Sequence, residues 1–124
     1  MATVPLTAEE RRRLRAHLAG ERAAAQRRLG GLDRTFDELV AAADLEPPDD
    51  EHDPDGTTAY ERAQVTSLAN ATRTVLRQLD LALDQLDDPG FGACTACGQP
   101  IGVARLEAVP GTTRCVRCAA LGTL

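Results

Sequence analysis

Four cysteines in two closely spaced pairs constrain this chain more than any other feature of its sequence. They are Cys94, Cys97, Cys115 and Cys118. Two residues separate the members of each pair, and 17 residues separate the two pairs. Each pair can wrap one side of a metal ion, and the segment between them can bring the second pair round. Because Zn²⁺ prefers four thiolates in a tetrahedron, the spacing predicts a structural zinc ion held by these cysteines.

Other uses of four cysteines fit the sequence less well. Two disulfides need an oxidising compartment, whereas charged residues begin at Glu9 and leave no hydrophobic signal region, so we expect a cytoplasmic protein. A thioredoxin-type redox pair starts a helix in an α/β pattern, which is absent here. An iron–sulfur cluster is possible chemically, but the spacing suits a zinc ribbon better. Four protein ligands leave zinc no open position, so the metal is expected to hold structure and not to catalyse.

Hydrophobic residues at helical spacing predict a first long helix over residues 7–43. Thr7 and Glu10 form the sequence signature of a capping box at its start. Its inward positions are expected at Leu14, Leu18, Ala25, Leu29, Leu32, Phe36, Leu39 and Ala43. The pair Gly30–Gly31 interrupts this helix, which indicates either a kink or a close approach of another helix.

A second long helix is expected over residues 58–88, with a capping box at Thr58 and Glu61 and a stop at Pro89–Gly90. Its inward positions are expected at Val65, Leu68, Thr72, Val75, Leu79, Ala82 and Leu86. Two arms of similar length and one connection favour an antiparallel hairpin. Pairing of both helices with a second chain is the alternative.

The fold class that follows is mainly all-α. An antiparallel helical hairpin, or coiled coil, is expected over residues 1–90, with its tip at residues 44–56. A small four-cysteine finger with a short C-terminal helix is expected over residues 91–124.

The connection at residues 44–56 carries seven carboxylates and three prolines and has no arginine. So many like charges in a short loop repel one another, which costs stability unless something uses them. The spacing of the acids does not fit an EF-hand, because the loop lacks a Glu at the twelfth position and contains prolines. A solvated loop is the plain interpretation; we favour an acidic probe for a metal ion or a basic channel.

Composition excludes several classes of function. The net charge is −5, so the whole chain is not a general nucleic-acid binder, and aromatic residues make up only 2%, which disfavours a deep enzyme pocket. No apolar run approaches the ~18 residues of a membrane span. The histidines, His17 and His52, lie far from the cysteines in sequence, and neither has a nucleophile beside it. We expect no enzyme and no membrane association.

The most specific stretch runs from Phe91 to Cys118 and reads FGACTACGQPIGVARLEAVPGTTRCVRC. With the hairpin and acidic tip before it, this stretch resembles the DksA/TraR family of bacterial transcription regulators. The resemblance implies that the chain binds RNA polymerase directly, not promoter DNA, and that the hairpin enters the secondary channel. The acidic tip would then act near the catalytic magnesium and alter initiation.

The resemblance also assigns residues to the tip. The family's motif is Asp-x-x-Asp-x-Ala, and this chain has Asp50 and Asp53 but Asp55 in place of the alanine. An extra carboxylate strengthens attraction to Mg²⁺ and to arginine-lined walls, but it cannot replace a small apolar contact. Asp50, Asp53 and Asp55 are therefore the expected polymerase-acting residues.

A second departure concerns the nucleotide ppGpp. The family binds it with basic residues at places that here hold Ala71, Val75, Gln78 and Ala119, none of them basic. The sequence therefore predicts weak or absent ppGpp coupling, unless Arg73 or Arg77 compensates.

Two other functions remain open at this stage. The first is a zinc-finger module that binds nucleic acid, although the finger is nearly neutral with its metal and has only Phe91 as a stacking platform. The second is a structural adaptor whose hairpin dimerises, whereas a protein that enters a channel is expected to be monomeric.

Overall fold

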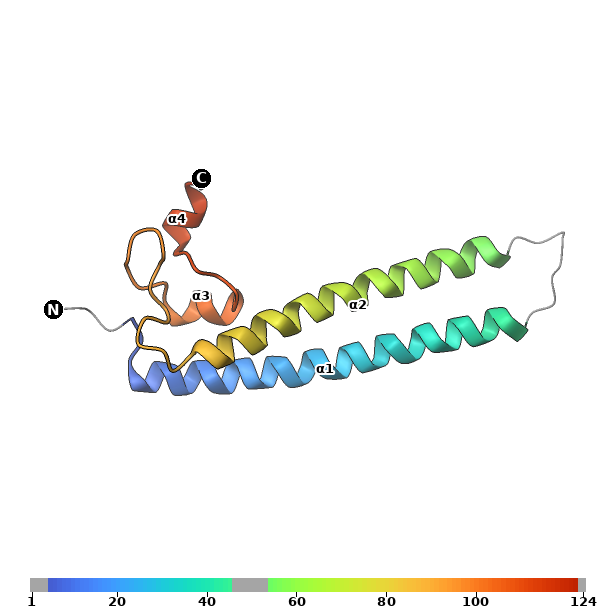
Figure 1. The fold of residues 1–124 in the computed structure, drawn as a ribbon, viewed down its shortest axis with the longest axis horizontal. Helices are drawn as coiled ribbons and strands as arrows, with labels where there is room; N and C mark the ends of the chain where they lie inside the picture. The colour runs from blue at the N-terminus through green and yellow to red at the C-terminus, as the bar shows by residue number, and fades with distance from the viewer. Residues whose placement is uncertain (1–4, 46–53, 123–124) are drawn as a thin grey trace. The chain divides into compact units, whose positions relative to one another are not determined.

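The structure, a computed structural model, describes residues 5–45 and 54–122. Its helices are α1 (Ala8–Leu45), α2 (Pro54–Gln85), α3 (Val103–Ala108) and α4 (Val116–Ala120) (Figure 1). Among the described residues, the only β pairing is an isolated bridge between Ala93 and Pro100. No helix in this part of the chain is long and apolar enough to cross a membrane. The mainly all-α fold, a helical hairpin followed by a four-cysteine finger with a short C-terminal helix, is confirmed.

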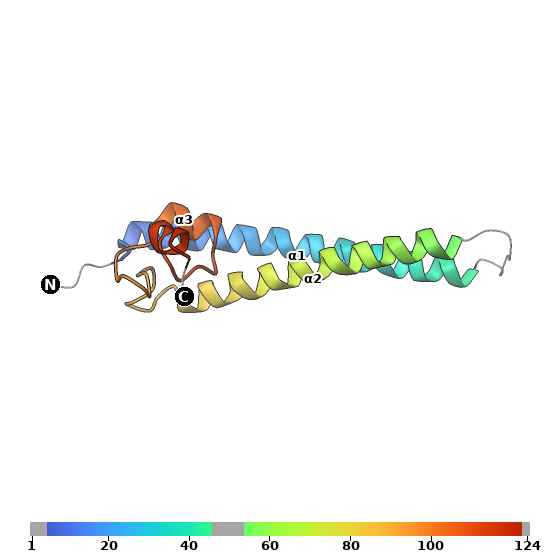
Figure 2. The ribbon, with the colours of Figure 1, turned by 90° about the horizontal axis from the view of Figure 1, so that it is seen from above.

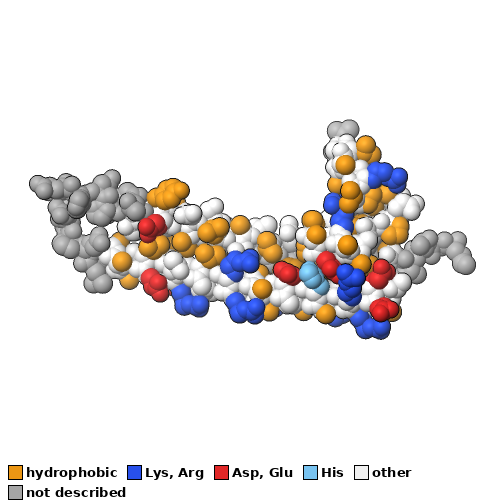
Figure 3. Space-filling view, turned by 180° about the vertical axis from the view of Figure 1, so that it is seen from behind, with side chains coloured by type: hydrophobic (Ala, Val, Ile, Leu, Met, Phe, Trp, Pro, Cys, Tyr) orange, Lys and Arg blue, Asp and Glu red, His pale blue; other side chains and the backbone are white. Residues whose placement is uncertain are grey.

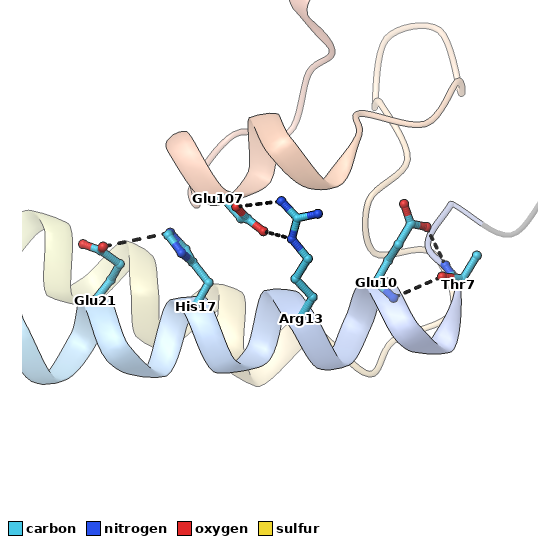
Figure 4. A network of polar contacts seen from close by, with 6 residues as sticks. All are labelled: Thr7, Glu10, Arg13, His17, Glu21 and Glu107. Atoms are coloured by element: carbon cyan, nitrogen blue, oxygen red, sulfur yellow. Dashed lines mark hydrogen bonds and ion pairs between the residues drawn. The ribbon is translucent and has the colours of Figure 1, made fainter.

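The start of α1 follows the predicted capping box. The backbone N–H of Glu10 donates to Oγ1 of Thr7 at 3.0 Å, and the N–H of Thr7 donates to Oε1 of Glu10 at 2.9 Å (Figure 4). These two bonds satisfy two backbone donors that the first turn of a helix leaves free. The helix therefore begins at Ala8, directly after the residue that caps it.

The start of α2 differs from the sequence prediction. The helix begins at Pro54, so Thr58 lies inside it and does not cap it. Proline is well suited to the first position of a helix, because its fixed backbone angle is helical and no N–H is needed there. The helix ends at Gln85, before the predicted limit, and Pro89–Gly90 lies in the turns that follow.

The chain forms two compact units. The base unit consists of Met1–Ala23 and Arg77–Leu124, and the distal unit of Ala24–Leu76. In each unit, α1 and α2 run antiparallel beside each other, as two perpendicular views show (Figures 1 and 2). The predicted division at residue 90 follows the order of the motifs along the chain, and it stays a prediction.

Large buried side chains concentrate in the base unit. The largest fully buried ones are Leu6, Leu14, Leu18, Leu79, Leu86 and Leu106. Four of these were predicted to face inward, because Leu14, Leu18, Leu79 and Leu86 recur at helical spacing; Leu6 and Leu106 come from outside the two seams. The core of this unit thus joins both long helices to the finger.

Two of the inward positions predicted for α2 in the distal unit are wrong, whereas Thr72 is buried as predicted. Leu68 and Val75 are 51% and 41% exposed, whereas the neighbouring Ala69 is only 4% exposed and Leu76 is half-buried. Each error exchanges two adjacent apolar residues, and both choices satisfy steps of three and four. Spacing alone could not decide between them, because the pattern is apolar at both positions.

The glycine pair of α1 neither breaks the helix nor admits a neighbour. The helix continues through Gly30 and Gly31. A Cβ built at Gly30 would meet only the side chain of Arg34, at 3.5 Å, so no second helix approaches closely there.

On the face drawn in Figure 3, arginine and carboxylate side chains are interspersed along the helices and are not segregated by sign.

Candidate metal centre

The first cysteine pair lies in a tight turn between Gly92 and Gly98. The backbone N–H of Gly98 donates to the carbonyl of Cys94, and the N–H of Cys94 donates to the carbonyl of Gln99, both at 2.8 Å. Gly92 and Gly98 adopt φ angles of 96° and 77°, which residues with a Cβ rarely adopt. Glycine is therefore suited to both ends of this turn, which places the two sulfurs in one cluster.

The second pair is positioned by the start of α4. Cys115 caps this short helix: its sulfur accepts from the backbone N–H of Cys118 at 3.5 Å. One turn of helix therefore sets the spacing between the two sulfurs. Thr95 ties the pairs together, since its N–H donates to the carbonyl of Thr113 at 2.9 Å.

The four sulfurs form a cluster that fits a metal ion. All four Sγ atoms lie within 4.8 Å of one another, and those of Cys97 and Cys115 are 3.8 Å apart. A tetrahedral zinc with bonds of about 2.3 Å places its sulfurs about 3.8 Å apart. All four cysteines are free of disulfides, and Cys94 and Cys115 are buried while Cys97 is exposed. The residues fit zinc, and the finger is a C4 type with a structural zinc.

Hydrogen bonds and burial within the finger shift the pKa values of three of the four cysteine thiols. A hydrogen bond from the backbone N–H of Cys115 is the main reason that the pKa of Cys94 is lowered to about 6. Burial of the thiol acts in the opposite direction but is a smaller effect. The backbone N–H of Cys118 lowers the pKa of Cys115. Hydrogen bonds from Cys118 to the sulfurs of Cys115 and Cys97 raise the pKa of Cys118 to about 12. Backbone N–H donors thus favour the thiolate forms of Cys94 and Cys115, which are the forms that bind a metal.

The N-terminal residues hold the finger in place, which sequence reasoning missed. Leu6 is 1% exposed, and a Cβ at Gly92 would lie 3.1 Å from its Cγ. Arg13 of α1 donates through Nε to Oε1 of Glu107 on α3 at 2.7 Å (Figure 4). Arg11 donates to the backbone carbonyl of Leu86, at the end of α2. An isolated leucine before a helix cap gives no periodic signal, so the spacing of apolar residues did not reveal Leu6.

The predicted tip lies mostly outside the described residues. Asp50 and Asp53 fall in the segment 46–53, outside the described residues. The backbone of Asp55 lies in the first turn of α2. The role of these three aspartates therefore stays a prediction.

The four positions where the family resemblance implies basic residues for ppGpp all lie within the described residues. Ala71 and Val75 are exposed in the distal unit, and Ala119 is exposed on α4 in the base unit. Gln78 packs on the finger, because a Cβ at Gly111 would lie 3.0 Å from its Cγ. Arg73, a possible substitute, pairs with Asp33 at 3.1 Å.

Known proteins resemble this chain in the finger and in the fold. Residues 89–121 match the family model described as the prokaryotic dksA/traR C4-type zinc finger. The RNA polymerase-binding transcription factor DksA of Haemophilus influenzae is 36% identical over 52 residues, which cover 42% of this chain and 36% of that protein. The protein of the same name in Escherichia coli K12 is 32% identical over 74 residues, or 58% of this chain and 49% of that protein. The chain thus spans less than half the length of these curated relatives.

One solved structure has a similar fold. The structure of transcription factor DksA2 from Pseudomonas aeruginosa matches with a TM-score of 0.76 at 24% identity, and the match covers 92% of this chain and 83% of that one. This likeness shows the fold. Residues 89–121 thus carry a finger of the prokaryotic dksA/traR C4 type, in a chain whose fold is similar to that of the solved DksA2.

Proposed function

We propose that this chain binds RNA polymerase directly and regulates transcription initiation. The observation that carries the proposal is the DksA/TraR finger at residues 89–121, set in a fold shared with a solved DksA2 structure. Relatives that are 36% and 32% identical to part of this chain are named RNA polymerase-binding transcription factors. The regulator acts by binding and not as an enzyme, and it works as a monomer in the cytoplasm.

The finger supplies the scaffold for this function. Cys94, Cys97, Cys115 and Cys118 are the zinc ligands, and bound zinc supplies a fixed tetrahedral link between the two cysteine turns. Because four thiolates close the coordination shell, the metal has no catalytic position. Glu107 of α3, the helix between the cysteine pairs, bonds to Arg13 of α1, which ties the finger to the long helices.

The hairpin is the part that reaches into the polymerase. It enters the secondary channel, and the acidic tip, with Asp50, Asp53 and Asp55, acts on the Mg²⁺ and basic groups at its end. Carboxylates are attracted to such groups through space, and the attraction strengthens where water is excluded. The aspartate at the alanine position of the family motif makes electrostatics, and not an apolar contact, the basis of this tip's effect.

DNA is not the target of the finger. The guanidinium of Arg105 is occupied inside the finger, donating through Nε to the carbonyl of Arg114 at 2.9 Å and through Nη2 to Oγ1 of Thr112 at 3.4 Å. It is therefore not presented to a phosphate backbone. A gel shift with random duplex DNA is expected to show no binding at 0.15 M salt, and a salt-dependent shift would favour the nucleic-acid alternative.

The polymerase proposal is tested with purified core enzyme and the zinc-loaded protein. We expect capture of the polymerase in a pull-down and a change in transcription in the same tube. The triple variant Asp50→Asn, Asp53→Asn and Asp55→Asn is expected to bind as well as the unchanged protein but to lose the effect on transcription.

The matched control removes three exposed carboxylates from the helices and leaves the tip intact. It is Asp37→Asn, Glu38→Gln and Glu61→Gln, which changes the net charge by the same amount. This variant is expected to keep both activities. Failure of the unchanged protein to bind polymerase would refute the proposal, and equal loss in both triple variants would refute the role of the tip.

Weak ppGpp coupling is part of the same proposal. Titration calorimetry of the polymerase complex is expected to show no ppGpp site that depends on this chain. Micromolar binding that is lost in Arg77→Ala would contradict it.

A further inference from the structure

The base unit contains a cavity of about 330 Å³ between the end of α2 and the finger, here called the base pocket. Leu81, Ala82 and Gln85 of α2 form one wall. Phe91, Ile101 and Pro110 of the finger contribute to the other. Cavities of this size and of mostly apolar lining are typical binding sites for a small molecule or for a protruding side chain.

The floor of the base pocket is apolar. Ala82, Ile101 and Leu106 line it, and each is at most 8% exposed. At the rim, Leu81 is 55% exposed. A large aliphatic side chain that continues a buried apolar floor out to the surface favours an occupant that covers it, because covering it removes apolar area from water.

The polar groups of the base pocket carry a single charge, and that charge is negative. Among the described residues that line it, Asp88 alone is charged, beside the neutral Gln78, Gln85, Thr95, Thr112 and Thr113. The carboxylate of Asp88 has no ion pair among the described residues; Arg11 approaches only its backbone carbonyl, at 3.4 Å. The occupant therefore needs no negative charge and gains from a positive one.

This lining disfavours a phosphorylated ligand. A polyphosphate that leaves water needs cations or several N–H donors to replace its hydration. Arg105 does not line the pocket, and its guanidinium is already bonded to the carbonyl of Arg114 and to Oγ1 of Thr112. One end of the pocket is formed by the neutral amide side chain of Gln78, packed against Gly111.

We propose that the base pocket receives an apolar side chain of the partner protein, and that a lysine or arginine beside this side chain pairs with Asp88. The inference rests on the proposed function, so the partner is RNA polymerase. It makes the base pocket a docking site separate from the acidic tip, and it predicts the chemistry of the polymerase segment that binds there.

The test measures the affinity of zinc-loaded protein for core polymerase, with three variants of the pocket. Leu81→Glu places a charge over the apolar floor and is expected to weaken binding at least tenfold. Asp88→Lys is expected to weaken it by a similar factor, and Asp88→Asn by severalfold. Leu121→Glu, at a leucine 79% exposed outside the pocket, is the matched control and is expected to bind normally. Unchanged zinc content and circular dichroism show that each variant is folded.

Each outcome separates this inference from the proposed function. If the unchanged protein does not bind polymerase, the proposed function itself fails. If it binds, and Leu81→Glu and Asp88→Lys bind equally well, the docking site is refuted while the proposed function stands.

A second measurement identifies the occupant. Benzoylphenylalanine at position 81 is expected to cross-link to a polymerase peptide with an apolar residue next to a lysine or arginine. A cross-link to this chain alone, or to an acidic polymerase segment, would overturn the proposal. So would displacement of the polymerase from the pocket by inorganic pyrophosphate at constant ionic strength.

Discussion

The two compact units use the same two helices but different kinds of packing. In the base unit six leucines are fully buried, and each such side chain contributes about 1.5–3 kcal/mol. In the described part of the distal unit, the buried side chains are the small Ala25, Ala69 and Thr72. The comparison teaches that one helix pair can be stable at one end because of the finger and weakly packed at the other, so local unfolding should begin in the distal unit.

Metal removal is the strongest way to test this difference. Zinc contributes on the order of 10–16 kcal/mol to small zinc domains, and here it stands at the centre of the finger. A chelator is expected to abolish amide protection in residues 93–120 and to leave residues 24–76 nearly unchanged, as measured by hydrogen exchange. Equal acceleration in both units would show that they unfold as one body.

Shortening one leucine in each unit compares the two cores directly. Leu86→Ala removes a side chain that is 0% exposed and is expected to cost about 2–5 kcal/mol. Leu68→Ala, at a position 51% exposed, is expected to cost less than about 0.5 kcal/mol. Urea unfolding followed by circular dichroism measures both. A large cost at Leu68 would restore the inward face first predicted from spacing.

Leu6→Ala tests whether the N-terminal residues belong to the base unit. The change leaves a hole beside Gly92 and is expected to cost about 2–4 kcal/mol, with faster transfer of zinc to a chromophoric chelator. Leu121→Ala, at an exposed leucine, is the control for zinc transfer. If Leu6→Ala releases zinc at the rate of the unchanged protein, the leucine does not support the finger.

Glycine substitutions sharpen the comparison in the opposite direction. Gly30→Ala and Gly31→Ala are each expected to stabilise the distal unit by about 0.5–1 kcal/mol, because alanine favours helix and its Cβ meets only Arg34. Gly20→Ala is the matched change in the base unit, where nothing lies within 4 Å. Hydrogen exchange should slow in residues 24–76 only for the first two changes.

The smallest effects are expected from the ion pairs. Asp33–Arg73 in the distal unit and Arg13–Glu107 in the base unit have N–O distances of 3.1 and 2.7 Å, and in both the arginine is largely exposed. Double-mutant cycles are expected to give about 0.2–1 kcal/mol for each pair, reduced by salt. A value above about 2 kcal/mol at Asp33–Arg73 would show that charge, and not burial, holds the distal unit.

Local signals in the sequence predicted much of the fold and the chemistry of the metal centre. The cysteine spacing led to the finger, and Thr7 with Glu10 marked the start of α1 because a capping box lies within one turn. The prediction of the inward residue of α2 was wrong at Leu68, because the neighbouring Ala69 is also apolar and is the residue that packs inward. The spacing fits both residues, so only the packing distinguishes them.

Contacts between distant segments could not be predicted. Arg13 and Glu107 lie 94 residues apart, and no spacing pattern connects the two positions. The base pocket combines the end of α2 with several separate stretches of the finger, so its lining becomes visible only once the chain is folded. The tip aspartates Asp50 and Asp53, which lie between the described segments, stay a prediction from the family resemblance.

The burial of Leu6 against Gly92 has a consequence for the order of events during synthesis. A ribosome makes Leu6 more than eighty residues before the glycine that covers it, so α1 emerges with part of its apolar surface still facing water. The base unit can close only when the last cysteines have left the exit tunnel and metal is at hand. Zinc supply would then set how long each newly made chain remains open to proteases and to aggregation.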